Sequence, residues 1–245
     1  MIVGFCGSGN MAAAMARGWA GRLDGMLFSD SGSGRALALA EELGGEAVGN
    51  ADLAARADFV VLAVKPAKLA EVAPELAEAR RVVSVLAAVG VSRLREALPG
   101  AEVLRVMPNV GVEVGRGVLC VAGEADPVVR ERLEQLGRVV DLPDDQFDEA
   151  TAVMGCSPAY FALVVQVLAE AGAAEGLDPD LARELVVETA AGTAELLRRH
   201  DPAALQRAVA SPGGSTEAGL LALDAEGARP AFEAAVRASL ERMRG

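Results

Sequence analysis

Side chains that commonly carry proton transfer are scarce in this sequence. It contains one histidine, His200, one tyrosine, Tyr160, and two lysines, Lys65 and Lys68. Enzymatic acid–base catalysis draws mainly on histidine, lysine, tyrosine and carboxylates. His200 has charged neighbours on both sides, which is typical of a solvated helix end, and Tyr160 is expected to pack near a helix start. We therefore expect a reaction that needs no histidine as an acid or base.

Cysteine is also scarce. Cys6, Cys120 and Cys156 are far apart, odd in number and without a CxxC pair, which excludes a disulfide framework and the usual zinc spacings. We expect no metal site and a cytoplasmic location. The start, MIVGFCGSG, lacks the basic segment and the long apolar run of a signal peptide, and Gln166 or Glu170 interrupts the longest apolar runs. The sequence thus predicts neither export nor a membrane span.

Positive charge is in deficit, with 23 lysines and arginines against 35 aspartates and glutamates and a formal net charge of −12. Such a charge opposes binding to nucleic acid or to anionic membranes, so neither is expected as a partner. The chain of 245 residues is 52% hydrophobic, which is enough to bury a substantial core.

The two parts of the chain differ in their patterns. Up to Gln146, helical stretches alternate with short apolar runs typical of strands: MIVGFC, MLFSD, DFVVLAV, RVVSVL, EVLRVM, GVLCVA and VVDL. After that, long helical patterns follow, over Ala159–Glu175, Leu181–Arg198, Pro202–Val209 and Arg229–Arg244. We predict an α/β protein with a Rossmann-type doubly wound sheet in a dinucleotide-binding domain, residues 1–146, and an all-helical domain, residues 147–245.

The stretch GFCGSGNMAAA follows the first apolar run and opens a helical pattern over Asn10–Trp19. Gly7, Gly9 and Ala12 form a G-x-G-x-x-A pattern, which gives a tight turn, a close approach for a pyrophosphate and a small residue where helix meets strand. The motif predicts a dinucleotide site that includes Asn10 and Met11.

A second stretch, FSDSGSGR, lies where the adenosine ribose is expected. An acid such as Asp30 there usually accepts from the ribose 2′-hydroxyl of NAD, whereas hydroxyls such as those of Ser31 and Ser33, with Arg35, can hold the 2′-phosphate of NADP. Both kinds are present. The cofactor is therefore NADP or NAD, with NADPH slightly favoured.

Two further stretches end strands at the carboxyl edge of the predicted sheet, where ligands of open α/β folds bind. Asn109 ends one of them and either contacts the cofactor or caps the turn. Lys65 is either a cofactor contact or an exposed charge. Lys65 belongs to the other stretch, AVKP, all of whose residues are expected to contact the cofactor: Ala63, Val64, Lys65 and Pro66.

A Pro-Gly-Gly turn stands inside the helical part, in SPGGST. If a helix starts at Thr216, several backbone N–H groups without partners point outward at its positive end, which suits an anion. The alternative is an ordinary helix cap. The residues expected at this site are Ser211, Gly213, Gly214, Ser215 and Thr216.

These motifs together resemble the pyrroline-5-carboxylate reductase family. The resemblance runs over nearly the whole chain and rests on GSGNMA, Asn50, AVKP, RVMPN, FDEATAVMGCSPAY and SPGGST, in the family's order. It implies a Rossmann domain followed by a helical dimerisation domain, and reduction of 1-pyrroline-5-carboxylate to L-proline by NAD(P)H. It also implies a homodimer or a ring of dimers.

The resemblance assigns roles as well. It implies that the Ser211–Thr216 turn binds the substrate carboxylate through backbone donors and that Thr216, the expected catalytic residue, lies near the imine nitrogen. It places Asn50 near the adenosine ribose, although Asn50 is also a candidate helix N-cap. The family's usual residues are replaced at Val110–Gly111, Ala87–Gly90, Cys156–Ser157 and Arg198–His200, around the expected pocket.

Chemistry independently favours an imine as substrate. A ketone needs a proton for its developing alkoxide, whereas a protonated iminium accepts hydride and becomes a neutral amine, which suits a chain with one histidine. The alternatives are another cyclic imine, a β-hydroxyacid dehydrogenase, and a non-catalytic NAD(P)-binding protein. The dehydrogenase is disfavoured because Ala159–Glu175 contains no lysine, and the non-catalytic protein because SPGGST is intact.

Overall fold

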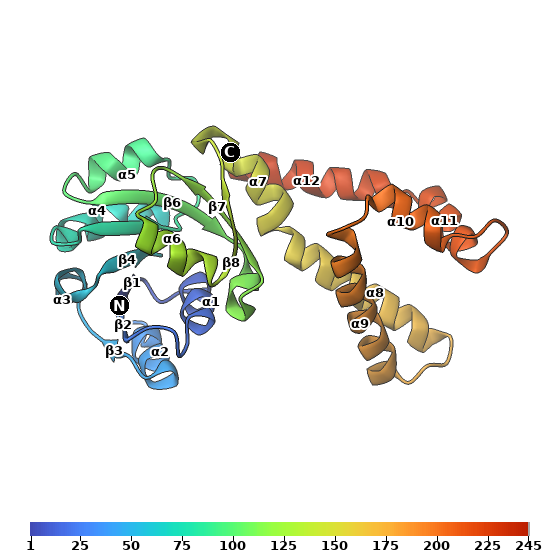
Figure 1. Cartoon of the computed structure of the whole chain (residues 1–245), viewed down its shortest axis with the longest axis horizontal. Coiled ribbons are helices and arrows are strands. Elements are labelled where there is room, and N and C mark those ends of the chain that lie inside the picture. Colours follow the sequence, from blue (N-terminus) through green and yellow to red (C-terminus); the bar gives the residue numbers. More distant parts are fainter. Residues whose placement is uncertain (245) are drawn as a thin grey trace. The chain divides into compact units, whose positions relative to one another are not determined.

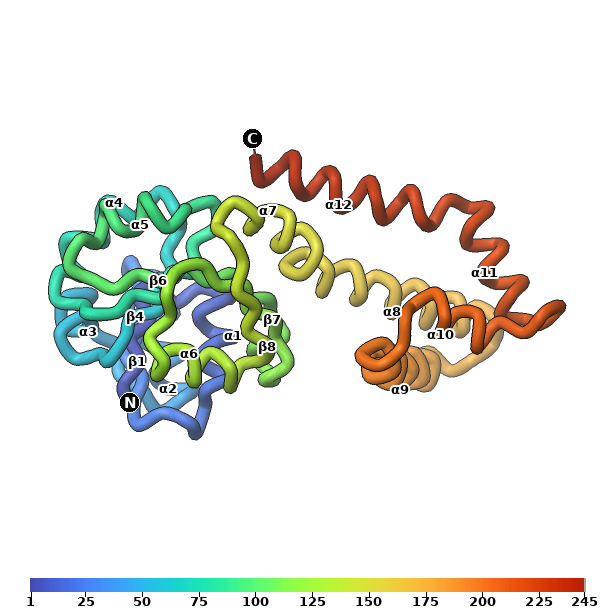
Figure 2. Tube along the Cα trace, turned by 45° about the horizontal axis from the view of Figure 1, so that its top comes forward, coloured from blue at the N-terminus to red at the C-terminus, as the bar shows by residue number. Residues whose placement is uncertain are grey.

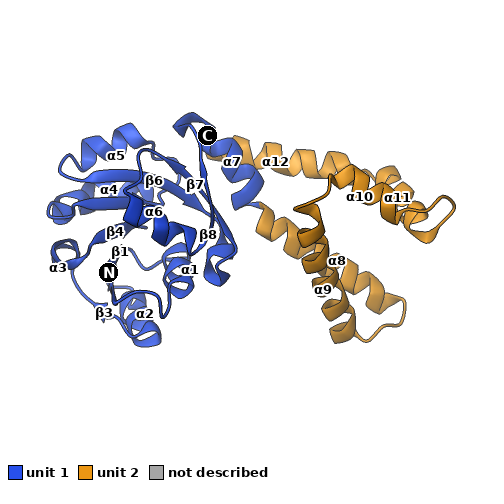
Figure 3. Cartoon of the chain, in the orientation of Figure 1, with its two compact units in different colours: residues 1–156, 244 blue, residues 157–243, 245 orange. Residues whose placement is uncertain are grey.

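The computed structural model describes residues 1–244, which form two compact units. The N-terminal unit holds residues 1–156 together with Arg244, and the helical unit holds residues 157–243 (Figure 3). A parallel sheet flanked by helices makes up the first unit, and helices alone make up the second (Figure 1). The predicted fold class is confirmed.

The sheet of the N-terminal unit has the strand order β3-β2-β1-β4-β5-β6-β7-β8. All neighbours pair in parallel except β6 and β7, which are antiparallel. The order reverses between β1 and β4, the switch point at which ligands of such sheets bind. The strands are β1 (Ile2–Cys6), β2 (Gly25–Ser29), β3 (Glu46–Ala47), β4 (Phe59–Leu62), β5 (Arg81–Ser84), β6 (Glu102–Pro108), β7 (Gly117–Ala122) and β8 (Gly137–Asp141).

Short helices connect these strands. The α-helices are α1 (Asn10–Gly18), α2 (Arg35–Leu43), α3 (Asn50–Arg56), α4 (Leu69–Val72), α5 (Val91–Ala97), α6 (Pro127–Glu134) and α7 (Phe147–Ala150). Single turns of 3₁₀-helix lie at η1 (Pro66–Lys68), η2 (Ala73–Leu76), η3 (Val110–Val114) and η4 (Asp144–Gln146), and a π-helical turn, η5 (Thr151–Gly155), follows α7.

Apolar clusters cover both faces of the sheet. On one face α1, α2 and α6 enclose an aromatic group in which Phe5 stacks on Phe28 with ring centroids 5.1 Å apart and Trp19 meets Phe59 edge-on at 5.9 Å. The Trp19 indole N–H donates to Arg132 O at 2.8 Å, so this buried polar group is satisfied. On the other face α3, α4 and α5 pack leucines and valines against the strands. The central strands are thus buried on both sides, as their apolar runs predict, whereas β3 is exposed and β8 is only partly buried.

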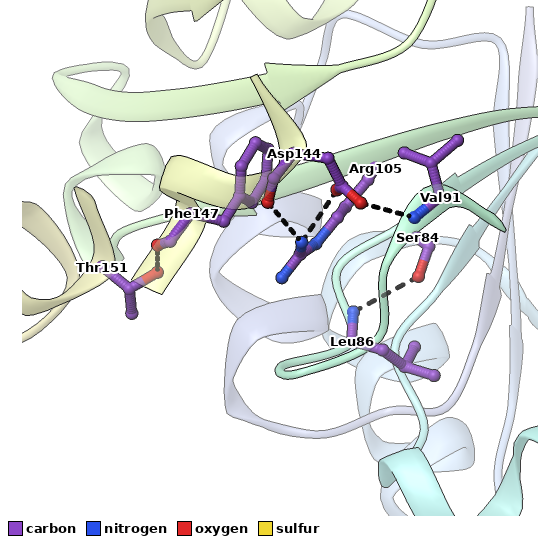
Figure 4. Close-up of polar contacts among 7 residues, drawn as sticks. All are labelled: Ser84, Leu86, Val91, Arg105, Asp144, Phe147 and Thr151. Carbon is purple, nitrogen blue, oxygen red and sulfur yellow. Dashed lines mark hydrogen bonds and ion pairs between the residues drawn. The ribbon is translucent and has the colours of Figure 1, made fainter. Parts of the chain in front are cut away.

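A buried arginine joins three segments of the N-terminal unit (Figure 4). Arg105 on β6 donates through Nη1 to Asp144 Oδ1 at 2.8 Å and to Asp144 O at 3.2 Å, and its guanidinium lies 4.2 Å from the centroid of the Phe147 ring. The second carboxylate oxygen of Asp144 accepts from Val91 N at 3.0 Å. One ion pair therefore joins the middle of β6, the start of α5 and the segment that leads into α7.

The helical unit contains α8 (Ser157–Ala174), α9 (Pro179–Leu197), α10 (Pro202–Val209), α11 (Ser215–Ala225) and α12 (Ala228–Arg244). Figures 1 and 2 show α8 and α9 side by side, and Ala169 and Ala182 lie buried in this unit. Most larger apolar side chains of the unit are exposed, including Phe161 at 70% and Leu221 at 66%. Within one chain, the described helical residues therefore form almost no core.

The structure places its division into units between Cys156 and Ser157, whereas the sequence pattern changes at Phe147. The continuous helical stretch Asp144–Ala174 lies across both positions. An 18-residue window within it has a mean hydropathy of 1.7, with 11% of that window buried, so the stretch is long and apolar enough to cross a membrane by length and composition. The same properties suit a helix that packs against a second polypeptide chain.

Ala88 lies in the left-handed region with a φ of 57°, in the exposed turn that follows β5. This conformation costs a non-glycine residue about 1–2 kcal/mol. Replacing Ala88 by glycine removes that penalty but adds about 0.5–1 kcal/mol of unfolded-state entropy. We expect Ala88→Gly to raise the free energy of unfolding by about 0.5 kcal/mol, measured by urea denaturation.

The neighbouring Ala87 supplies a matched control, because its φ is not positive. Ala87→Gly gains nothing in the folded state and is expected to lose about 0.5–1 kcal/mol. Equal losses for the two variants would show that the backbone at Ala88 carries no penalty.

Candidate functional site

The turn between β1 and α1 lies at the switch point of the sheet. Gly7 has a φ of 97°, and a Cβ there would come within 2.7 Å of Ala63 O, so only glycine allows the turn to rest on the end of β4. Gly7 N donates to Ser29 O at 3.1 Å, and the Ser8 hydroxyl donates to the same oxygen at 3.0 Å. The turn is therefore held by both neighbouring strands.

Gly9 has a different role in this turn. It is the N-cap of α1, its side of the turn is open, and a Cβ at Gly9 would meet nothing within 4 Å. Since the first N–H groups of a helix have no partner within it, Asn10 and Met11 offer donors at the positive end of α1. Asn10 is exposed, while the Met11 side chain packs against the core beneath. This geometry suits a pyrophosphate.

A cavity of about 530 Å³ opens beside the turn. It brings together most of the predicted cofactor residues: Gly7, Gly9, Asp30, Ser31, Arg35, Asn50, Ala63, Val64 and Lys65. Asn10 lines an adjoining hollow of about 350 Å³ that shares Gly9 and Arg35 with the cavity, whereas Met11, Pro66 and Asn109 line neither. Pro66 is the exposed first residue of η1.

The cavity also contains residues that the sequence analysis missed. They are Ser8 and three charged side chains on the short helical turns after β4: Lys68, Glu71 and Glu75. Lys68 Nζ pairs with Glu71 Oε2 at 2.5 Å. The charged residues recur at intervals of three and four, a spacing that could have indicated one helical face beyond the AVKP motif. The Lys65 side chain is exposed and has no hydrogen-bond or ion-pair partner within residues 1–244.

Asn50 is fixed by contacts on both ends of its amide. Its oxygen accepts from the Ser29 hydroxyl at 2.5 Å and from the Cys6 thiol at 3.4 Å, and its nitrogen donates to Glu75 at 2.7 Å. Burial raises the pKa of Cys6 to about 12, so the thiol stays protonated and can donate. Gly49 occupies the N-cap of α3 without a side-chain cap bond, so the interpretation of Asn50 as a cap was wrong.

Asp30 follows β2 directly and accepts three hydrogen bonds. Oδ1 accepts from Gly32 N at 2.8 Å, and Oδ2 accepts from the Ser33 hydroxyl at 2.8 Å and from Ala36 N at 3.0 Å. The hydrogen bond from Ala36 N, followed by those from the Ser33 hydroxyl and from the backbone N–H groups of Gly32 and Arg35, lowers the pKa of Asp30 to about 2. The side chain of Arg35, at the start of α2, is exposed and has no hydrogen-bond or ion-pair partner in the described part of the chain.

Asn109 is the N-cap of η3, as one of its two interpretations predicts. Its oxygen accepts from Gly111 N at 3.2 Å and from Val118 N at 3.1 Å, while its nitrogen donates to Met154 O in the π-helical turn at 3.1 Å. These contacts leave one amide N–H of Asn109 without a protein partner.

The predicted substrate turn lies in the helical unit, where α11 begins at Ser215. Gly214 is the N-cap of α11, so the turn does contain a helix cap, as the alternative predicts, but no side-chain hydrogen bond from Thr216 or its neighbours caps the helix. The Thr216 hydroxyl is exposed and without a partner among residues 1–244. The Ser215 N–H likewise lacks an acceptor in the described chain, whereas Gly213 N donates to Glu217 Oε2 at 2.7 Å and Gly214 N to Ser211 O at 2.9 Å.

The two remaining candidates for proton transfer do not lie in either site. His200 is exposed after the end of α9, as expected. The Tyr160 hydroxyl on α8 contacts the Ser239 hydroxyl at 2.7 Å and Ala235 O at 3.5 Å, both on α12. Tyr160 therefore ties two helices of the same unit together.

Comparison with known proteins places the chain. Residues 144–245 match the family model for pyrroline-5-carboxylate reductase dimerisation, and residues 2–88 match that for coenzyme F420-dependent NADP oxidoreductases. Pyrroline-5-carboxylate reductase from Synechocystis sp. is 36% identical over 204 residues, which cover 79% of this chain and 76% of the relative. The chain belongs to the pyrroline-5-carboxylate reductase family. The family predicted from the motifs is thereby confirmed.

Solved structures extend the similarity to the full length. The 1-pyrroline-5-carboxylate reductase of Streptococcus pyogenes has a TM-score of 0.87 at 28% identity, with 99% of this chain and 98% of that chain covered. The Plasmodium falciparum pyrroline carboxylate reductase, solved with NADP bound, has a TM-score of 0.86 at 25% identity, with coverages of 99% and 97%. Both the sheet and the helices of these reductases therefore have counterparts here.

The open side of Gly9 gives a test of the dinucleotide site. A valine side chain at Gly9 meets no protein atom on its Cβ and fills the approach to the turn. We expect Gly9→Val to keep its melting temperature and to weaken NADPH binding at least about tenfold, or ~1.4 kcal/mol, in a fluorescence titration.

Gly7→Val is the matched variant of the same turn. Its Cβ would clash with Ala63 O and its φ is unfavourable, so it is expected to lower the melting temperature as well. Normal NADPH affinity in folded Gly9→Val would place the dinucleotide elsewhere.

Proposed function

We propose that this protein reduces 1-pyrroline-5-carboxylate to L-proline by hydride transfer from NAD(P)H. The observation that carries the proposal is the similarity to reductases of this name over both units, including the dinucleotide turn and the SPGGST turn. The decisive assay follows NAD(P)H oxidation with 1-pyrroline-5-carboxylate, other cyclic imines and ketoacids. Turnover confined to a ketoacid would refute the proposal.

The cofactor site is proposed to lie in the 530 Å³ cavity and its adjoining hollow. The pyrophosphate contacts the turn at Gly7 and Gly9 and the N–H groups of Asn10 and Met11. Ser31 and Arg35 serve the adenosine end with Asp30 and Asn50 beside them, and the edge of the sheet after β4 and β6 serves the nicotinamide end through Ala63, Val64, Lys65, Pro66 and Asn109. The dihydronicotinamide supplies the hydride when bound.

The substrate site is proposed at the start of α11. The Ser215 N–H and the outward donors of the first helical turn receive the carboxylate, with Ser211, Gly213 and Gly214 shaping the turn. The Thr216 hydroxyl contacts the imine nitrogen. Because the iminium becomes a neutral amine on receiving hydride, the chain needs to orient the ring and exclude water more than to deliver a proton. The exposed position of His200 is consistent with this chemistry.

Thr216→Val tests the catalytic assignment, since it keeps the shape of the side chain and removes its hydroxyl. We expect kcat/KM for the imine to fall about 10- to 100-fold, or roughly 1.5–3 kcal/mol, with unchanged affinity for NADPH. Thr216→Ser retains a hydroxyl and is expected to stay close to wild type. Unchanged kcat/KM in Thr216→Val would remove this residue from the site.

NADPH is proposed as the preferred cofactor, because the exposed Arg35 side chain lies beside the adenosine end of the cavity and has no partner among residues 1–244. We expect Arg35→Ala to weaken NADPH about tenfold and NADH hardly at all, since only NADPH carries a 2′-phosphate. Dissociation constants from fluorescence titrations decide the point. Equal effects on the two cofactors would exclude a contact between Arg35 and the 2′-phosphate.

A homodimer or a ring of dimers is proposed for the helical unit. Its exposed apolar side chains, such as Phe161, Leu163 and Val167 on α8, and its match to a dimerisation model support a second copy as the surface that covers them. We propose this copy, and not a lipid bilayer, as the partner of the apolar Asp144–Ala174 stretch. A cytoplasmic location without nucleic-acid partners stays a prediction.

Light scattering tests the assembly. We expect at least twice the chain mass of 25.1 kDa at micromolar concentration, because the unit has almost no core of its own. Dilution should lower the molar mass and the helical circular dichroism together. A folded monomer of 25.1 kDa would contradict the proposal.

A further inference from the structure

Asp30 occupies the position at which many dinucleotide-binding sheets use an acid to bind the ribose of NAD. It stands directly after β2 and lines the 530 Å³ cavity. By position alone, Asp30 would favour NADH and repel the 2′-phosphate of NADPH. Its contacts point to the opposite role.

The carboxylate of Asp30 is largely occupied by its own chain. Two carboxylate oxygens offer about four acceptor sites, and Gly32 N, the Ser33 hydroxyl and Ala36 N take three of them. The two hydroxyls of a ribose need two acceptor sites for a paired contact. Asp30 retains at most one, because the backbone N–H of Arg35 also acts on the carboxylate. Asp30 can therefore bind a ribose diol in this way only if the loop opens.

The same three bonds determine the shape of the loop. Gly32 and Gly34 have φ values of 89° and 77°, so residues 31–34 form a tight loop before α2 begins at Arg35. Gly34 caps α2 without a side-chain bond, and Asp30 accepts from Ala36 in the first turn of that helix. Asp30 therefore links the end of β2 to the start of α2 and fixes the point from which Arg35 extends.

We propose that Asp30 is a positioning residue for the 2′-phosphate of NADPH. Its carboxylate holds the Ser31–Arg35 loop in the conformation in which the Arg35 side chain lines the cavity. Asp30 itself does not bind the ribose hydroxyls. This inference rests on the cofactor part of the proposed function. It reverses the effect that an acid at this position has in an NAD site.

The negative charge of Asp30 does not cancel the gain that the 2′-phosphate obtains from a well-placed Arg35. The three donors and the positive end of α2 oppose its negative charge locally, while Arg35 offers an unpaired guanidinium to the incoming phosphate. With its pKa lowered to about 2, Asp30 stays ionised through the neutral range, and the loop keeps its shape there. The loss of loop geometry on removing the carboxylate outweighs the relief of a screened repulsion.

The test uses two adenosine ligands that differ in one phosphate, 2′,5′-ADP and 5′-AMP, and Asp30→Asn. The amide keeps the size of the side chain but cannot accept from both Ser33 and Ala36 through its nitrogen. We expect the dissociation constant of 2′,5′-ADP, measured by calorimetry, to rise roughly 5- to 20-fold, as for loss of hydrogen bonds to a charged group, and that of 5′-AMP to change less than about twofold. Tighter binding of 2′,5′-ADP, or an equal loss for both ligands, would overturn the proposal.

Asp30→Glu separates charge from geometry, since it retains the carboxylate but moves it along the longer side chain. Under the proposal it also weakens 2′,5′-ADP selectively. Wild-type values for both ligands in Asp30→Glu would show that charge alone matters, against the proposal. Melting curves with and without 5′-AMP establish that each variant is folded.

A double-mutant cycle with Arg35→Ala tests whether Asp30 changes the affinity for 2′,5′-ADP through Arg35. If Asp30 acts by presenting Arg35, Asp30→Asn adds little to the loss already caused by Arg35→Ala. Independent, additive losses would overturn the link. These measurements need no imine, so a failure of the reductase assay leaves them interpretable, and a failure here leaves the reductase assignment standing.

Discussion

The close approach of Gly7 to the backbone of Ala63 is the contact on which the candidate cofactor site depends. It brings the first turn of the chain against the end of β4, and the bond from Ala63 N to Cys6 O at 2.8 Å continues the pairing of β1 with β4. Because the turn is also bonded to Ser29 O, three strand ends are fixed around one position without a side chain. The positions of the cavity, the exposed end of α1 and the loop after β2 depend on these contacts at Gly7.

Much of the fold follows from the sequence because each central strand is a short, mainly apolar run. The expected runs correspond to β1, β2 and β4 through β8, and a helix does begin within SPGGST, at Ser215. The strand β3 escaped prediction, since Glu46 and Ala47 are exposed and too few to show a pattern. The π-helical turn at Thr151–Gly155 escaped as well, because its composition is that of an ordinary helix.

The candidate site was predicted less completely than the fold. Motif spacing led to Gly7 and Gly9, whose roles depend on local backbone shape. Glu75 was missed because its place beside Asn50 arises from tertiary packing across 25 residues of chain. The hydrogen bonds of Asp30 could not be predicted from the sequence either, because a motif gives the position of an acid but not the donors that surround it.

The thiol of Cys6 gives the cofactor turn a chemical property of its own. It lies one residue before Gly7, is buried, and donates to Asn50. With a pKa raised to about 12, roughly one thiol in 100,000 is ionised at pH 7, and only the thiolate reacts readily with peroxides or alkylating agents. The Cys6 thiol beside the dinucleotide turn is thus a hydrogen-bond donor that offers little thiolate to oxidants.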